Sequence, residues 1–185
     1  MSRSMLSLSE LYLNTAEWFL DEKEPDSEEL ALQLNGQEAF LLRTAQALDE
    51  FWFTPSPPAY VRKALELAEL QPSDVILDVG AGDGRLALMA LQAFGVRKAY
   101  AIEANPIVVH HSRPLLQSIP GLIYAEGVFQ TAKFASEVTA AFFLAWHCPE
   151  KTVYKLKDRL RAETQCRILI HNSGTPFSLT RVSLK

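Results

Sequence analysis

Cysteine, long apolar runs and a large net charge are all absent or scarce in this sequence of 185 residues. Its two cysteines, Cys148 and Cys166, are too few for a disulfide framework or for a zinc site with four cysteine ligands. No apolar run reaches about 18 residues, and Glu10 and Glu17 interrupt the segment where a signal peptide needs an apolar core. We therefore expect a cytoplasmic protein with reduced cysteines and no membrane partner.

The charge balance also lacks the basic excess that is typical of nucleic-acid-binding proteins. Eighteen Lys and Arg side chains face 22 Asp and Glu side chains, which gives a formal net charge of −4. The charge is uneven, because residues 1–50 hold 11 acidic and 3 basic side chains, whereas residues 51–185 hold 11 and 15. Apolar residues make up 48% of the chain, enough for an ordinary hydrophobic core without metal. A nucleic-acid partner and a metal are therefore not expected.

The first third of the chain has a helical pattern. Leu41, Ala45, Leu48 and Trp52 follow one another at steps of 4, 3 and 4 residues, the period of a buried helix face. The proline-rich stretch 55–58 stops this pattern, since proline lacks an amide donor and disfavours helical geometry before it. We predict an N-terminal helical extension over residues 1–52 and a main domain over residues 53–185 that begins with a helix over 59–70.

Short apolar runs follow at regular intervals from residue 75 onward, and helical stretches separate them. They cover residues 75–79, 99–103, 122–125, 140–145 and 167–171. Runs without polar alternation indicate strands that helices cover on both faces, and their spacing is typical of successive β-α units. The pattern predicts an α/β domain with a Rossmann-like, doubly wound and mostly parallel sheet. Residues 173–185 leave room for one more strand, so we expect six strands or a chain shortened at its C-terminus.

A glycine-rich turn follows the first of these runs. Asp78 lies on the strand, and Gly80, Gly82 and Gly84 alternate before a helical stretch. Glycine lets the backbone approach a ligand closely, because no β-carbon stands between them. The spacing differs from the GxGxxG fingerprint that binds a pyrophosphate, and a carboxylate at Asp78 would repel phosphate. The turn therefore favours a ligand with a cationic group.

An acidic residue also closes the second apolar run. Glu103 follows Asp78 by 25 residues, where a carboxylate can accept both hydroxyl protons of a ribose. The turn and Glu103 together predict an adenosine-type ligand without phosphates, for which S-adenosylmethionine is the candidate cofactor. The alternative is a tight turn in an unrelated α/β protein whose glutamate caps a helix.

These residues resemble the class I, or seven-β-strand, S-adenosylmethionine-dependent methyltransferases. More narrowly, residues 53–106 are similar to the small protein-lysine methyltransferases of archaea and their mitochondrial relatives. That group has the motifs YVPTP, DLGxGDGR and an acid that opens an E-x-N/D stretch. The corresponding segments here are Phe53 to Pro57, Asp78 to Arg85 and Glu103 to Pro106.

The resemblance implies where the cofactor lies. Gly80 and Gly82 would pass against its methionine part, Asp78 would meet its amino group, and Glu103 would hold its ribose. The full set implied for cofactor binding is Phe53, Ser56, Asp78, Gly80, Ala81, Gly82, Glu103, Ala104, Asn105, Glu126 and Gly127. Two positions depart from the family pattern. Phe53 replaces a tyrosine, and Val128 stands where an acid near adenine is expected, so either Glu126 or backbone groups would hold adenine.

No general base can be identified from the sequence. Trp146, His147 and His171 are the catalytic candidates, because they end the fourth and fifth strand-like runs, at the usual catalytic edge of such a sheet. His110 and His111 are adjacent and cannot share one helix face, so they do not indicate a metal site.

The resemblance implies direct, in-line methylation of a lysine side chain in a protein substrate. The segment after the fourth run lacks the Asn/Asp-Pro-Pro-aromatic motif of enzymes that methylate nucleobase amines. Two alternatives remain. The chain could methylate a small molecule or another acceptor, or it could be a catalytically degenerate domain that binds the cofactor and serves as a scaffold. The oligomeric state is not indicated.

Overall fold

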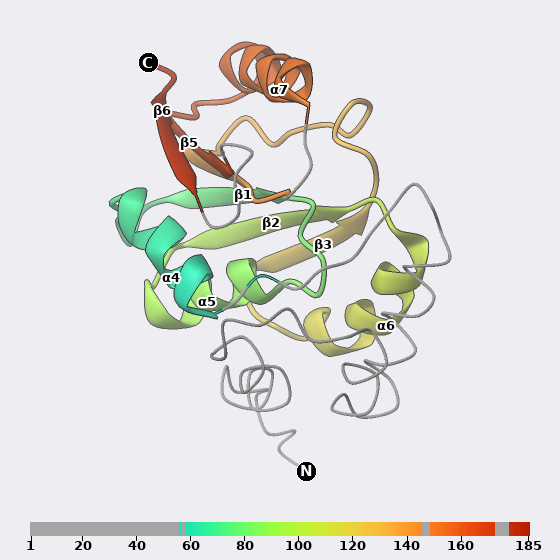
Figure 1. Ribbon diagram of the computed structural model, residues 1–185. Coiled ribbons are helices and arrows are strands. Elements are labelled where there is room, and N and C mark those ends of the chain that lie inside the picture. The colour runs from blue at the N-terminus through green and yellow to red at the C-terminus, as the bar shows by residue number, and fades with distance from the viewer. Residues whose placement is uncertain (1–55, 57, 146–148, 173–177) are drawn as a thin grey trace.

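The computed structural model describes Ser56 and residues 58–145, 149–172 and 178–185, in which helices lie on both faces of one sheet (Figure 1). None of the helices in this part of the chain is long and apolar enough to cross a membrane. The elements are, in order, α4 (Pro58–Leu67), β1 (Val75–Val79), α5 (Arg85–Ala93), β2 (Lys98–Glu103), α6 (Pro106–Leu116), β3 (Leu122–Glu126), β4 (Ala140–Phe143), α7 (Glu150–Glu163), β5 (Ile168–Asn172) and β6 (Leu179–Ser183).

The sheet has six strands in the order β3-β2-β1-β4-β5-β6. Strands β1 to β5 are parallel, and β6 pairs antiparallel with β5. The chain moves outward from β1 through β2 to β3 and then returns to β4 on the other side of β1. The strand order thus reverses between β1 and β4, and ligands of doubly wound sheets bind at the carboxyl ends of the strands beside such a point. This topology confirms the predicted mostly parallel, six-stranded sheet.

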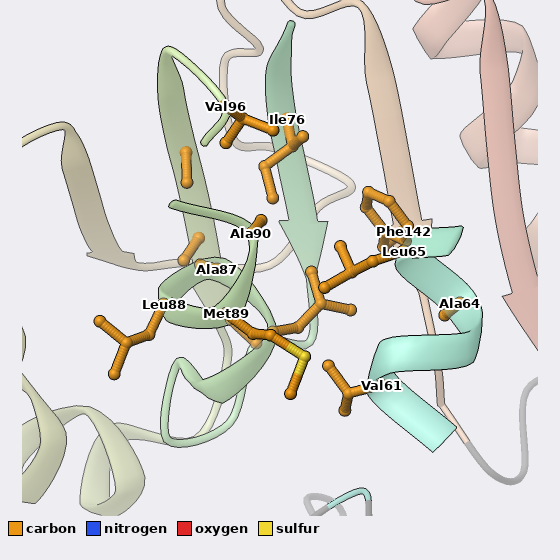
Figure 2. Close-up of a cluster of buried hydrophobic side chains, with 14 of the residues drawn as sticks. Val61, Ala64, Leu65, Ile76, Ala87, Leu88, Met89, Ala90, Val96 and Phe142 are labelled. Atoms are coloured by element: carbon orange, nitrogen blue, oxygen red, sulfur yellow. The ribbon is translucent and has the colours of Figure 1, made fainter. Parts of the chain in front are cut away.

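Hydrophobic clusters on both faces explain why β1 is buried at all five positions. Successive side chains of a strand point to opposite faces. Ile76 accordingly joins the cluster under α4 and α5, which Figure 2 shows with Leu65, Ala87 and Phe142 around it. Leu77 joins the cluster on the other face, where α7 packs. This burial fixes the directions in which Asp78 and its neighbours point.

Two predicted boundaries shift for local reasons. The first helix ends at Leu67 instead of residue 70, because the chain turns at Glu69, whose φ is 51°. The fourth strand ends at Phe143 instead of residue 145. The other four predicted strands begin and end within a single residue of their expected bounds. The predicted N-terminal helical extension, residues 1–52, lies outside the described residues.

Candidate cofactor site

The glycine turn lies at the carboxyl end of β1 and is bonded to β2. Gly80, Gly82 and Gly84 have φ values of 74°, 55° and 79°, which L side chains rarely adopt. The backbone amides of Gly80 and Ala81 donate to the carbonyl oxygen of Ile102 at 2.8 and 3.0 Å. The turn therefore needs glycine for its shape and follows the end of β2 closely.

The first and last glycines of the turn have different surroundings. A β-carbon at Gly84 would lie 2.5 Å from Cδ1 of Leu116 on α6, so this glycine lets α6 pack against the start of α5. A β-carbon at Gly80 would meet no atom within 4 Å among the described residues. The backbone of Gly80 thus borders open space, which is where a ligand could lie against it.

Glu103 ends β2 and organises the turn. Its side chain is only 9% exposed. Oε2 accepts the Gly82 amide at 2.7 Å, and Oε1 accepts the Asn105 amide at 2.7 Å. Burial raises the pKa of Glu103, although these amides oppose the increase. A carboxylate has about four accepting lone pairs, so these backbone bonds leave Glu103 with accepting capacity for a ribose.

Asp78 is a buried acid that forms no ion pair with any of the described residues. It is 3% exposed, and its Oδ2 accepts no hydrogen bond from the described residues. Burial, together with the nearby charges of Glu103 and Asp83, raises the pKa of Asp78 to about 8. A buried carboxylate without a partner is costly, whereas a cationic ligand beside it would remove that cost. Asp78 therefore suits the ammonium group of S-adenosylmethionine.

A buried arginine connects the turn to the segment before α4. Arg85 is 3% exposed, and its Nε and Nη2 donate to the two carboxylate oxygens of Asp83 at 2.9 and 2.5 Å. Its Nη1 donates to the carbonyl oxygen of Ser56 at 3.0 Å. The structure thus places Ser56 beside the turn through its backbone. Sequence reasoning included Arg85 in the glycine motif but assigned it no role.

Tyr124 of β3 is a site residue that sequence reasoning missed. Its hydroxyl donates to the carbonyl oxygen of Gly82 at 2.5 Å. The sequence offered no signal for this contact, because Tyr124 follows Gly82 by 42 residues and belongs to an ordinary apolar run. The backbone of Gly82 is therefore bound at its amide by Glu103 of β2 and at its carbonyl by Tyr124 of β3.

Asn105 and Ala104 support the site in ways the sequence only partly indicated. The Asn105 side chain caps α6, since its Oδ1 accepts the amides of Ile107 and Val108 at 3.0 and 3.4 Å. The amide of Ala104 hydrogen-bonds the Glu103 carboxylate. Asparagine before Pro106 is a recognisable helix start, with a good cap followed by proline at the first helical position. A direct role of Asn105 in cofactor binding stays a prediction.

The predicted adenine region lies at the end of β3. Glu126 is exposed and in register with Glu103 on the neighbouring strand. The Gly127 amide donates to the backbone carbonyl of Glu103 at 2.9 Å. Val128 is 38% exposed. This segment is thus adjacent to Glu103, the residue that is predicted to bind the ribose. The groups of this segment that would hold adenine stay a prediction.

The catalytic candidates are only partly covered by the described residues. Phe53, Trp146 and His147 lie outside them. His171 is half-buried on β5, in register with Phe143, and its Nδ1 lies 2.8 Å from the carbonyl oxygen of Asn172. A carbonyl only accepts, so this contact assigns the proton to Nδ1 and leaves a lone pair on Nε2.

Known proteins provide an independent comparison. A protein-lysine N-methyltransferase of Saccharolobus islandicus is 27% identical over 122 residues, which cover 64% of this chain and 74% of that protein. An RNA methyltransferase of Salinibacter ruber, solved with S-adenosyl-L-homocysteine, has TM-score 0.60 and 21% identity over 71% of this chain and 94% of that chain. A precorrin-6y C5,15-methyltransferase of Geobacter metallireducens has TM-score 0.55 and 17% identity over 70% of each chain. No known protein-family profile matches.

The chain has the fold of the class I S-adenosylmethionine-dependent methyltransferases, and its sequence is similar to that of a protein-lysine methyltransferase. Both findings agree with the resemblance carried by the glycine turn and Glu103. The site fits S-adenosylmethionine, since Asp78 presents an uncompensated carboxylate to a cation and Glu103 retains acceptors for a ribose. The three similar proteins have different acceptors in their names, so the fold leaves the methyl acceptor open.

Proposed function

We propose that this chain methylates the side-chain amine of a lysine in a protein substrate. The enzyme class, an S-adenosylmethionine-dependent methyltransferase, rests on the fold, the similar sequence and the chemistry of the site together. The lysine acceptor rests on one observation, the 27% identity to a protein named protein-lysine N-methyltransferase. The sequence after β4, from Leu144 to Pro149, also lacks the motif of enzymes that methylate nucleobase amines.

The described residues suggest how the cofactor would bind. Asp78 would accept from the ammonium group, and the open side of Gly80 would face the methionine chain. Glu103 would accept from the ribose with the accepting capacity that its bonds to the Gly82, Ala104 and Asn105 amides leave unused. The acidic site would favour the cationic cofactor over its neutral thioether product, because removal of the methyl group removes the positive charge on sulfur. This preference helps product release.

Methyl transfer to lysine needs little covalent chemistry from the protein. When bound, S-adenosylmethionine supplies an electrophilic methyl group on a cationic sulfur. A neutral lysine amine would take this methyl group, and the electron pair of the carbon–sulfur bond would stay on sulfur. The protein must therefore align the amine and remove its proton. His171 is the base we propose, since Nδ1 is held by the Asn172 carbonyl and Nε2 has a free lone pair.

Label transfer tests the acceptor. The full chain is incubated with methyl-labelled S-adenosylmethionine and a lysate of the source cell, and label is measured in protein, nucleic acid and small molecules. We expect label in protein, and methyllysine after hydrolysis of that fraction. Gly82→Val serves as the matched control, because a branched side chain at a positive φ would block the turn. An excess of S-adenosylhomocysteine over the wild-type chain provides a second control.

Other outcomes of the same experiment correspond to the other functions. Label in nucleic acid or in a metabolite would refute the lysine acceptor and leave the enzyme class intact. Binding of S-adenosylmethionine in calorimetry without label transfer to any fraction would support a scaffold that only binds the cofactor. No heat and no thermal shift at millimolar cofactor would refute the cofactor itself.

A further inference from the structure

Both backbone polar groups of one turn residue, Gly82, are bound by side chains from neighbouring strands. The Gly82 amide donates to Oε2 of Glu103 at 2.7 Å, and the Gly82 carbonyl accepts from the Tyr124 hydroxyl at 2.5 Å. Glu103 ends β2, and Tyr124 lies on β3. Gly82 needs such restraints because glycine at a positive φ has many conformations of similar energy.

The direction of each hydrogen bond at Tyr124 can be assigned. A carbonyl only accepts, so the tyrosine hydroxyl must donate its proton to Gly82. Its oxygen can then accept from the hydroxyl of Ser112, with which it also forms a hydrogen bond. Ser112 is 4% exposed and lies on α6. Burial raises the pKa of Tyr124 above its ordinary value, so the hydroxyl stays a neutral donor at physiological pH.

The strand register explains how Tyr124 reaches the turn. Asp78, Ala101 and Tyr124 are in register across β1, β2 and β3, so their side chains point to the same face. The middle residue is an alanine with only a methyl group. Tyr124 packs against the hydrophobic cluster that contains Ala101, and its hydroxyl extends to the turn.

We propose that Tyr124 is a positioning residue of the cofactor site, whose hydroxyl, supported by Ser112, holds the Gly82 carbonyl and with it the backbone of the turn in the ligand-binding orientation. The inference rests on the proposed function, because it assumes that the turn receives S-adenosylmethionine. A preorganised turn loses less conformational entropy on binding, so Tyr124 changes cofactor affinity and leaves the chemical step alone. Glu103 shares this positioning role and in addition faces the ribose.

Tyr124→Phe and Tyr100→Phe form a matched pair for the test. Tyr100 lies on β2, and its hydroxyl donates to Oε1 of Glu137 at 2.8 Å near the other end of the sheet. We expect Tyr124→Phe to raise the calorimetric Kd of S-adenosylmethionine about three- to tenfold. The kcat at saturating cofactor should stay within about twofold of the wild type. Hydrogen exchange of residues 79–86 without ligand should become faster, and Tyr100→Phe should change none of these quantities.

Each result decides the proposal. An unchanged Kd and exchange rate in Tyr124→Phe, or equal changes in Tyr100→Phe, would overturn it. A lower kcat with unchanged Kd would also overturn it, since it would place Tyr124 in the chemical step. If Tyr124→Phe does not fold, Ser112→Ala replaces it, and unchanged exchange of residues 79–86 there overturns the proposal. A wild-type chain that binds no cofactor refutes the proposed function, whereas the exchange measurement still tests the bond to Gly82.

Discussion

Acidic side chains at the two ends of the sheet have opposite surroundings. At the amino ends of the strands, Asp74 accepts from Arg167 at 2.8 Å and from the Thr139 hydroxyl at 2.7 Å. Glu137 accepts from Lys98 at 2.9 Å and from a tyrosine hydroxyl. These partners lower the pKa of both acids, and that of Glu137 falls to about 2. At this end, the acids are compensated within the fold.

Two acids at the carboxyl ends of the strands, Asp78 and Glu103, differ from this pattern. Asp78 and Glu103 form no ion pair with a lysine or arginine of the described residues, and burial raises the pKa of both. Asp83 is paired with Arg85. Acidic residues thus stabilise the folded chain at the amino ends of the strands, whereas at the carboxyl ends Asp78 and Glu103 are available to bind a ligand. Stability is sacrificed where a cation has to bind.

The largest effect is expected from Glu103→Ala, which should lower both the stability of the protein and its affinity for the cofactor. Glu103→Ala leaves the buried amides of Gly82 and Asn105 without acceptors, at a cost of about 1–3 kcal/mol for each. Thermal unfolding should show this loss, and calorimetry should show at least a hundredfold weaker cofactor binding, because the proposed ribose contact would be lost too. Glu103→Gln keeps one carbonyl acceptor, so its stability and cofactor affinity should lie between those of the wild type and of Glu103→Ala. A folded Glu103→Ala chain with normal affinity would contradict the assignment.

The next largest effect is a change in stability, which should have opposite signs for matched Asp→Asn variants at the two ends of the sheet. Asp78→Asn removes a buried acid whose Oδ2 has no hydrogen-bond partner among the described residues, so the free protein should gain about 1–3 kcal/mol of stability at pH 8, where part of this acid is charged. Its Kd for S-adenosylmethionine should rise about 10- to 100-fold, because a charge-assisted bond is lost. Asp74→Asn, the matched variant, should lose stability through its Arg167 pair and bind the cofactor normally. Destabilisation by Asp78→Asn would mean that Asp78 has a partner.

The pH dependence separates the two ends without mutation. The pKa values of Asp78 and Glu103 are raised in the folded protein. Their contribution to the free energy of unfolding is therefore complete below the ordinary carboxyl pKa and is lost as the pH rises. For Asp78 this loss continues up to about pH 8. The lowered pKa values of Asp74 and Glu137 give stability that is present above the ordinary value and is lost in acid.

The thermal midpoint of the free protein should therefore be highest on the acidic side of neutral and fall toward pH 8. Bound S-adenosylmethionine should reduce this fall, since its cation favours charged Asp78. Midpoints measured across this range with and without cofactor check the prediction, and Asp78→Asn is the control in which the free protein loses most of the fall. Identical slopes with and without cofactor would contradict it.

Much of the fold was predictable because its signals are local. The strands were found because helices bury both of their faces, which leaves uninterrupted apolar runs such as residues 75–79. The turn was found because three glycines at positive φ leave a spacing that can be seen in the sequence. Glu103 was found because it ends the next run.

The rest of the site depends on contacts between distant residues. Tyr124 reaches Gly82 across 42 positions, and Arg85 reaches Ser56 across 29. A tyrosine in a strand usually packs, and nothing in its own run indicates a bond to a turn. The sequence likewise does not show that Oδ2 of Asp78 has no hydrogen-bond partner in the described part of the chain, whereas Asp74, four residues earlier, has several partners. Register and helix packing decide these differences.

The smallest effect is expected from Val128→Asp, which tests cofactor affinity in the segment after β3, the edge strand of the sheet. Val128 is 38% exposed and follows Gly127, whose amide is bonded to the Glu103 carbonyl. If adenine lies there, Val128→Asp supplies an acceptor for its amino group, and we expect about two- to fivefold tighter binding of S-adenosylmethionine.

A second carboxylate would also attract the cationic cofactor from a distance, so the hydrogen bond must be separated from the charge. A cofactor analogue with a carbonyl in place of the adenine amino group has the same charge and lacks the donor. Val128→Asp should tighten binding of the natural cofactor and leave the analogue unchanged or weaker. Equal gains for both, decreasing as salt is added, would assign the effect to charge alone. No gain for either would place adenine away from Val128.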